Sequence, residues 1–204
     1  METDESDRAK EVFSKLSELF PEEYSVWLFL SFMQEHLGFP ADAEKSLNKA
    51  LEINETDQAY FHLGVVKDQL GEAEESYAAF KKAIELNPNH APAKNYLGYL
   101  WVEADINLQE AKELIKSALE LEPDNGAYLD SLGWLYFRLS RYEEALKYLK
   151  MADELVDDPV IKEHLGDTYI KLDDIPSALE AYTSALSLDT DSAEIKEKIQ
   201  KYTN

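Results

Sequence analysis

A pattern of small and large apolar residues that spans 34 positions restricts this chain more than any other feature of its sequence. It is clearest in residues 57–90, where Tyr60 and Gly64 are followed by Phe80 and Pro88. Two apolar-periodic segments of about a dozen residues lie on either side of a Leu-Gly break, and Asn-Pro closes the second segment. The stretch therefore predicts a helix, a turn and a second helix. Such a unit has to stack on further copies, because neither helix has an apolar face wide enough to be stable alone.

Small residues hold three positions of this pattern, represented by Gly64, Ser76 and Ala83. A hydrogen atom or a small side chain at these positions lets the two helices approach closely and leaves space for the bulky Phe80. We therefore expect tight packing within every pair of helices.

The same pattern can be laid over nearly the whole chain. The chain opens with half a unit, in which Ala9, Phe13, Leu16 and Pro21 match the second helix of a repeat. The predicted division is a half-repeat capping helix at 4–23, repeats at 24–56, 57–90, 91–125, 126–158 and 159–192, and a capping helix at 193–204. It predicts one continuous solenoid over residues 1–204, with about 12 helices.

Turn and capping residues predict where individual helices begin. The repeat at 91–125 has one additional residue before its second helix, which we assign to the turn between its helices. Asn107 and Ser140 each precede a glutamate by three residues, which is the spacing of a capping box. Asp158 precedes a proline and is predicted to be the N-cap of the next helix.

This spacing resembles the tetratricopeptide repeat, whose pattern over 34 residues is Trp, Leu-Gly, Tyr, Ala, Phe, Ala and Pro. Residues 97–139 are also similar to bacterial repeat proteins. The resemblance implies an all-α fold, a right-handed α-α superhelical solenoid of stacked helix-turn-helix units. It also implies a non-enzymatic protein–protein interaction scaffold, because this repeat serves many unrelated binding tasks.

The resemblance further implies that the first helix of each repeat lines a concave groove. With Asp57 as position 1 of its repeat, and the other repeats counted in the same way, positions 2, 5, 9, 12 and 13 are presented to a peptide or helical segment of a partner. Large rings and a few charged residues hold these positions in adjacent repeats. The predicted partner-binding residues are Phe32, Phe61, Tyr99, Asp130, Trp134, Phe137 and Arg138. The alternative for Tyr99 and Trp134 is that their rings pack between neighbouring first helices as core. The aromatic residues at position 11, Trp101, Tyr136 and Tyr169, are expected to be core.

The charge of the chain limits its partners. It has 42 acidic and 20 basic residues and a formal net charge of −22, which disfavours nucleic acid and anionic membranes. A basic or an apolar protein segment is the expected partner. Acidic residues outnumber basic ones at the predicted groove, but hardly more than in the whole chain, and the acidity is also explained by the solubility of an exposed fold.

Chemistry that would indicate an enzyme is missing from the sequence. The four histidines, His36, His62, His90 and His164, have no metal-binding spacing and are interpreted as surface or packing residues. There is no cysteine, phosphate-binding glycine loop or nucleophile motif. We therefore expect no catalytic activity, no cofactor and no metal.

Two alternatives to groove binding remain: a structural self-assembly module, whose copies pack through terminal or convex faces, and the recruiting arm of a larger enzyme complex. A chaperone adaptor is not expected, because the lysine and asparagine positions of such domains hold residues such as Leu28 and Phe32. No uncharged run approaches the roughly 18 residues of a membrane span, and the acidic N-terminus is unlike a signal peptide. A soluble cytoplasmic protein is expected, or a periplasmic one if an export signal has been removed.

Overall fold

The computed structural model describes the backbone of residues 2–203 and the side chains of residues 11–203. The predicted small residue Ala9 therefore lies outside the described side chains. The helices in this range are α1 (Glu2–Leu19), α2 (Tyr24–His36), α3 (Pro40–Ile53), α4 (Asp57–Gln69), α5 (Ala73–Leu86), α6 (Ala91–Glu103), α7 (Leu108–Leu121), α8 (Gly126–Arg138), α9 (Tyr142–Leu155), α10 (Pro159–Lys171), α11 (Ile175–Leu188) and α12 (Ala193–Thr203). Residues 2–203 contain no strand, so the predicted all-α fold is confirmed.

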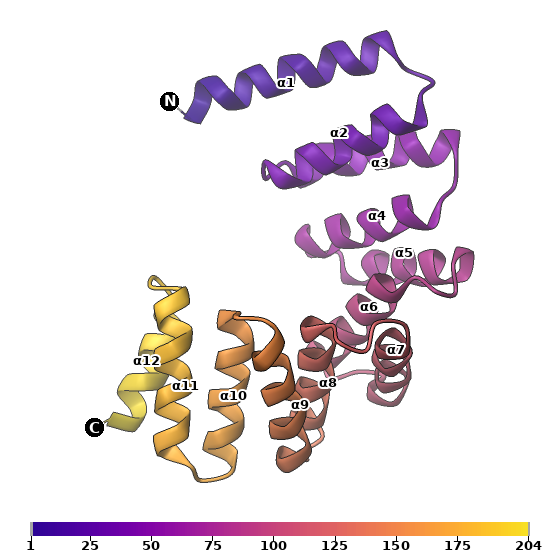
Figure 1. The fold of residues 1–204 in the computed structure, drawn as a ribbon. Coiled ribbons are helices and arrows are strands. Elements are labelled where there is room, and N and C mark those ends of the chain that lie inside the picture. Colours follow the sequence, from indigo (N-terminus) through magenta and orange to yellow (C-terminus); the bar gives the residue numbers. More distant parts are fainter. Residues whose placement is uncertain (1, 204) are drawn as a thin grey trace. The chain divides into compact units, whose positions relative to one another are not determined.

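The helices between α1 and α12 form five pairs of nearly identical dimensions (Figure 1). Each first helix, α2, α4, α6, α8 or α10, has 13 residues, and each second helix has 14. Three residues join the helices of a pair, except between α6 and α7, where residues 104–107 form the connection. The additional residue of this repeat lies in the turn, as predicted. Repeat positions are counted below from the first residue of each first helix.

The chain forms two compact units, residues 1–93 and residues 94–204. The first contains the pairs α2–α3 and α4–α5, and the second contains α8–α9 and α10–α11. The unit boundary lies within α6, so the pair α6–α7 belongs to the second unit apart from the first turn of α6.

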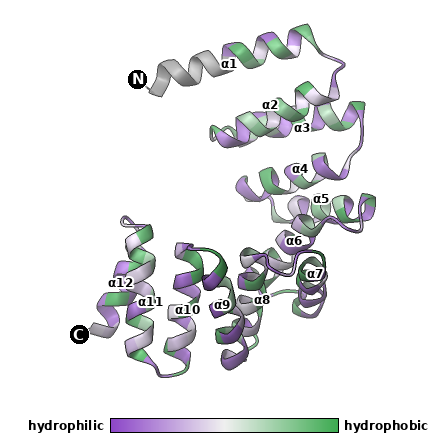
Figure 2. Cartoon of the chain, in the orientation of Figure 1, coloured by the Kyte–Doolittle hydropathy of each residue, from purple (hydrophilic) through white to green (hydrophobic). Residues whose placement is uncertain are grey.

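Small residues and one bulky residue lock the two helices of each pair together. A Cβ atom on Gly64 would come within 2.7 Å of the Phe80 ring, and a Cβ atom on Gly166 within 2.3 Å of the Tyr182 ring. The bulky residue is at most 1% exposed in all five pairs. Figure 2 shows that each helix carries both hydrophobic and hydrophilic residues. The predicted reason for the small residues, close approach of the paired helices, is therefore confirmed.

The capping predictions were right at Asp158, right only in position at Asn107 and wrong at Ser140. Asp158 accepts a hydrogen bond from the backbone N–H of Val160 and caps α10. Asn107 is the N-cap residue of α7, but its side chain makes no cap hydrogen bond. Ser140 precedes Arg141, which is the N-cap residue of α9. Asn107 and Ser140 both adopt left-handed backbone conformations, with φ of 47° and 57°, a region in which Asn is enriched among the residues other than glycine.

Candidate partner-binding face

The seven predicted partner-binding residues all lie on first helices. Phe32 and Phe61 belong to α2 and α4 of the first unit, and the other five belong to α6 and α8 of the second. We call the side chains at positions 5, 6, 9, 12 and 13 of the first helices the first-helix face. Within the second unit the structure brings Trp134, Phe137 and Arg138 close to one another, whereas Tyr99 lies half-buried on α6.

Two side chains at position 6 of a first helix contact the preceding first helix, one in each unit. His164 of α10 contacts Asp130 and Trp134, at positions 5 and 9 of α8. His62 of α4 contacts Phe32, at position 9 of α2, with ring centroids 6.2 Å apart. In these two places, position 6 links consecutive repeats on the face where a ligand was predicted to bind.

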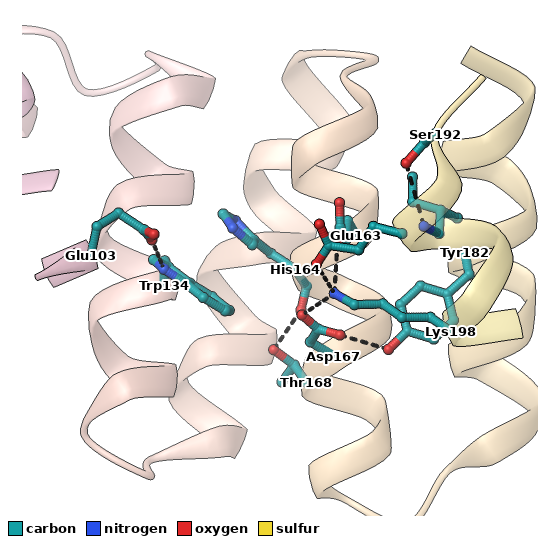
Figure 3. A network of polar contacts seen from close by, with 11 residues as sticks. Glu103, Trp134, Glu163, His164, Asp167, Thr168, Tyr182, Ser192 and Lys198 are labelled. Atoms are coloured by element: carbon teal, nitrogen blue, oxygen red, sulfur yellow. Dashed lines mark hydrogen bonds and ion pairs between the residues drawn. The ribbon is translucent and has the colours of Figure 1, made fainter. Parts of the chain in front are cut away.

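Trp134 is the centre of an aromatic cluster in the second unit. Its ring stacks on Phe137 with a centroid distance of 4.5 Å and on His164 with a centroid distance of 4.0 Å, and both pairs are nearly parallel. His164 is 7% exposed, and its Nδ1 lies 2.9 Å from Oδ1 of Asp130, which is also 7% exposed. Figure 3 shows the imidazole of His164 directed toward Trp134. The carboxylate of Asp130 therefore contacts His164 inside the protein, whereas Trp134 and Phe137 are partly exposed.

The other edge of the cluster is polar. The indole Nε1 of Trp134 donates a hydrogen bond to the carboxylate of Glu103 at the end of α6. Arg138 Nη1 donates to the backbone carbonyl of Glu103 over 3.0 Å, and its Nη2 lies 3.5 Å from Asp105. Trp134 thus contacts both neighbouring first helices, α6 and α10, which is the packing that the alternative interpretation of this residue predicts. Arg138 is half-buried and carries the positive charge of this edge.

Lys198 of α12 contacts α10 in the same way as His164 of α10 contacts α8. It is position 6 when α12 is counted from Ala193, and its Nζ donates to Glu163 over 2.6 Å and to Asp167 over 2.9 Å. Tyr182 donates its hydroxyl hydrogen to Asp167 over 2.7 Å, and Figure 3 shows the three groups converging. Although burial opposes its charge, the hydrogen bonds and charges of Asp167 and Glu163 raise the pKa of Lys198 above its ordinary value.

In the first unit, Phe61 and two histidines form a second cluster. The ring centroid of Phe61 lies 5.4 Å from that of His62 and 5.0 Å from that of His90. His62 Nδ1 is 3.7 Å from a carboxylate oxygen of Glu35, and His90 Nδ1 accepts a hydrogen bond from the backbone N–H of Ala93. Burial lowers the pKa of His90 below its ordinary value of 6.5, partly offset by the charge of Asp57.

His164 and Lys198 were not predicted to belong to the first-helix face. Each position was considered within its own repeat, so contacts with the preceding helix were not taken into account. The signal was present in the sequence: His164 stands at position 6 after an acidic position 5, and so does Lys198. Trp101 and Tyr136 are buried, as expected of position 11, whereas Tyr169 is half-buried.

Within the described residues, no group of three or more His, Asp or Glu residues could hold a metal ion. No helix in that range combines the length and the apolar character needed to cross a membrane. One cavity, of about 250 Å³, is lined by residues of α9, α10 and α11, including Lys150, Tyr169 and Ser184.

Comparisons with known proteins agree on the repeat. Models of the tetratricopeptide repeat match residues 57–90, 107–158 and 161–192. A tetratricopeptide repeat-containing protein of Pseudomonas aeruginosa is 28% identical over 149 residues, which are 71% of this chain and 25% of that protein. The anaphase-promoting complex subunit CDC16 of Saccharomyces cerevisiae is 26% identical over 192 residues, 89% of this chain and 22% of that protein.

A shorter match links the chain to the mitochondrial import receptor subunit TOM70 of Saccharomyces cerevisiae, 34% identical over 67 residues, 33% of this chain and 11% of that protein. The chain thus spans a quarter or less of the length of these relatives. Among solved structures, the Cut9–Hcn1 hetero-tetramer of the anaphase-promoting complex matches with a TM-score of 0.86 at 20% identity, covering 99% of this chain and 40% of that one. A thermophilic repeat protein of Thermus thermophilus matches with a TM-score of 0.75 at 20% identity, covering 89% of this chain and 99% of that one. These structural matches show the fold alone.

Proposed function

This chain belongs to the tetratricopeptide repeat family, and on that premise we propose that it is a non-enzymatic scaffold that binds a peptide or helical segment of a partner protein along its first-helix face. We further propose that the five helix pairs act as one solenoid, with α1 and α12 as capping helices. The family consists of interaction modules, and the relatives CDC16 and TOM70 are named as subunits of a complex and of a receptor.

The observation that carries this proposal is the partly exposed Trp134–Phe137 stack. Large rings held rigidly by their neighbours are where binding energy concentrates in protein interfaces. Trp134 is held by His164 and by Glu103, so little conformational freedom would be lost when a partner contacts it. Phe137 lies one turn further along α8, and its ring centroid is 4.5 Å from that of Trp134. The two rings therefore form a preorganised apolar anchor.

Charge suggests the chemistry of the partner. Glu103 is exposed at one edge of the anchor, whereas the carboxylates of Glu163 and Asp167 on α10 are paired with Lys198. The net charge of −22 would accelerate the approach of a basic segment. We therefore favour a partner segment that carries apolar side chains for the rings and basic side chains at its edges.

A photo-crosslinking amino acid placed at Phe137 tests this proposal in the full chain. The expected result is one dominant adduct with another protein. The matched control places the same amino acid at Glu143, on the second helix α9, where no such adduct is expected. Equal adducts at both positions, or an adduct at Glu143 alone, would contradict binding along the first-helix face.

The two alternatives predict other results. A self-assembly module would form adducts with a second copy of the chain, and its mass by light scattering would rise with concentration. A recruiting arm would form its adduct with an enzyme of the same complex. This second alternative is motivated by the length of the relatives, because this chain spans a quarter or less of each of them.

A further inference from the structure

The cavity of about 250 Å³ in the second unit, which we call the α9–α11 pocket, is lined by residues of α9, α10 and α11. Figure 1 shows α10 between the other two helices, and α10 packs against both. The α10 residues of the pocket stand at positions 4, 7 and 11, so it shares no position with the first-helix face. At position 11 the pocket is lined by Tyr169, which is half-buried, whereas Tyr136 at the same position of α8 is only 6% exposed. The pocket therefore uncovers a ring whose equivalent is covered in the preceding repeat.

The junction one repeat earlier, between α7, α8 and α9, shows what covers this ring. The ring of Tyr136 stacks on that of Tyr148, the seventh residue of α9, with centroids 5.4 Å apart and nearly parallel planes. The seventh residue of α11 is Ala181, which lines the α9–α11 pocket. A methyl group thus stands at the position from which a phenol ring would cover Tyr169.

The pocket is also polar where the earlier junction is apolar. Leu119 and Tyr148 pack against a buried cluster that includes Leu129. The residues that correspond to the two leucines, the twelfth of α9 and the fourth of α10, are Asp153 and Lys162. Nζ of Lys162 lies 2.6 Å from Oδ1 of Asp153, so an ion pair stands in the place of apolar packing. Because apolar cavities stay dry and polar ones hold hydrogen-bonding molecules, the pocket is suited to a ligand with a polar group.

Other groups in the pocket have hydrogen-bonding capacity that the protein does not use. Within residues 11–203, Lys150 and Glu180 form no ion pair, and the hydroxyl groups of Ser177 and Ser184 form no hydrogen bond. Nζ of Lys150 lies 5.5 Å from the ring centroid of Tyr169, which places an ammonium group beside the uncovered ring. The charges of Lys150 and Glu180 are opposite. An uncharged group that both accepts and donates a hydrogen bond therefore fits the pocket better than an ion does.

We propose that the α9–α11 pocket binds a tyrosine side chain of a partner protein. Its ring would stack on Tyr169 as the ring of Tyr148 stacks on Tyr136. Its hydroxyl group would accept a hydrogen bond from Lys150 and donate one to Glu180. A protein side chain is the expected occupant, because a protein side chain fills the corresponding place in the preceding repeat. Tyrosine is also enriched among the residues that contribute most to protein interfaces.

The experiment measures binding of two probes to the full chain by NMR titration. The probes are N-acetyl-tyrosinamide and N-acetyl-phenylalaninamide, which lacks only the hydroxyl group. For the tyrosine probe we expect saturable shifts of the amide signals of Tyr169 and Ala181, with a Kd on the order of 1 mM for so small a ligand. The phenylalanine probe should bind about threefold more weakly or worse, because it cannot form the hydrogen bonds of the phenol.

Three variants test whether the probe occupies the pocket. Ala181→Tyr fills it from within, as Tyr148 does in the preceding repeat, and should weaken binding by about tenfold or more. The control Thr183→Tyr adds the same side chain at an exposed position of α11 and should change binding less than about twofold. Lys150→Met changes an exposed side chain and should bring the two probes to within about twofold of each other. Unchanged circular dichroism would show that each variant is folded, and Lys150→Met tests the pocket alone if Ala181→Tyr does not fold.

Several results would overturn the proposal. They are the absence of saturable shifts in the pocket, equal weakening by Ala181→Tyr and Thr183→Tyr, and equal binding of the two probes by the parent chain. Binding of p-cresol without binding of N-acetyl-tyrosinamide would assign the pocket to a free phenol. A mass that rises with concentration in the parent and stays monomeric in Ala181→Tyr would assign it to a second copy of this chain. The titration does not depend on the proposed function of the first-helix face, which the crosslink from Phe137 tests separately.

Discussion

Replacement of Trp134 by alanine is the perturbation that best examines the first-helix face. The substitution removes two ring stacks, on Phe137 and on His164, and the hydrogen bond to Glu103. Each aromatic pair contributes about 0.5–1.5 kcal/mol, and the hydrogen bond contributes about 1 kcal/mol. We therefore expect Trp134→Ala to lower the free energy of unfolding by about 2–4 kcal/mol, a fall in Tm on the order of 10 °C for a unit of this size.

Two variants make this magnitude specific. Trp134→Phe keeps a smaller ring in place and loses the N–H donor and part of the stacked surface, so it should cost about 1–2 kcal/mol, less than Trp134→Ala. Phe32→Ala alters the same repeat position on α2, where the ring is 53% exposed and its described contact is the edge of His62 at 6.2 Å. It should cost about 1 kcal/mol or less. The difference between Trp134→Ala and Phe32→Ala therefore reports mainly how many contacts an aromatic ring makes at this repeat position.

Urea unfolding of the full chain, followed by far-UV circular dichroism, provides the free energies, and hydrogen exchange in α8 and α10 locates the loss. The reasoning would be refuted if Trp134→Ala changed the free energy of unfolding by less than about 0.5 kcal/mol. It would also be refuted if Phe32→Ala cost as much. In either case the ring of Trp134 would not link the first helices. Whatever the loss of stability, the binding of a partner by each variant is to be compared at a temperature at which that variant is folded.

Three further predictions concern the packing and charge of the repeats. Gly166→Ala should lower stability by about 1–3 kcal/mol in thermal unfolding, because its Cβ would lie 2.3 Å from the Tyr182 ring; an increase, as helix propensity alone predicts, would contradict the packing. Lys198→Met leaves two carboxylates without their cation and should accelerate hydrogen exchange in α12, whereas Lys196→Met, at an exposed position, should not. Burial lowers the pKa of His90 in the folded state, so its contribution to stability is complete above about pH 6.5 and is lost as the pH falls through the lowered value. The first unit should therefore melt earlier at about pH 5.5 than at about pH 7.5. A His90→Asn variant, whose side-chain oxygen can replace Nδ1 as the acceptor for the Ala93 N–H, should show a smaller difference.

The sequence by itself determined the helix pairs. The spacing of Gly64 and Phe80, and of Gly166 and Tyr182, specifies which two helices can approach closely, and these residues lie only 16 positions apart. The additional residue before α7 could also be placed in its turn, because the repeat pattern of small and large apolar residues is unbroken on both sides of it. Local contacts of this kind depend on helix geometry alone and are therefore visible in the order of the residues.

The tertiary structure decided which side chains face one another across successive repeats. Trp134 was predicted to line a groove, yet its ring also stacks on His164, 30 positions further along the chain. Lys198 pairs with the carboxylates of Glu163 and Asp167, at positions 5 and 9 of the preceding first helix. Asn107 and Ser140 were expected to cap helices, but the tight turns hold their backbones in the left-handed region. The contacts of Trp134 and Lys198 depend on how far one helix pair is rotated and shifted against the next. That displacement results from the packing of many side chains together, which no single spacing in the sequence encodes.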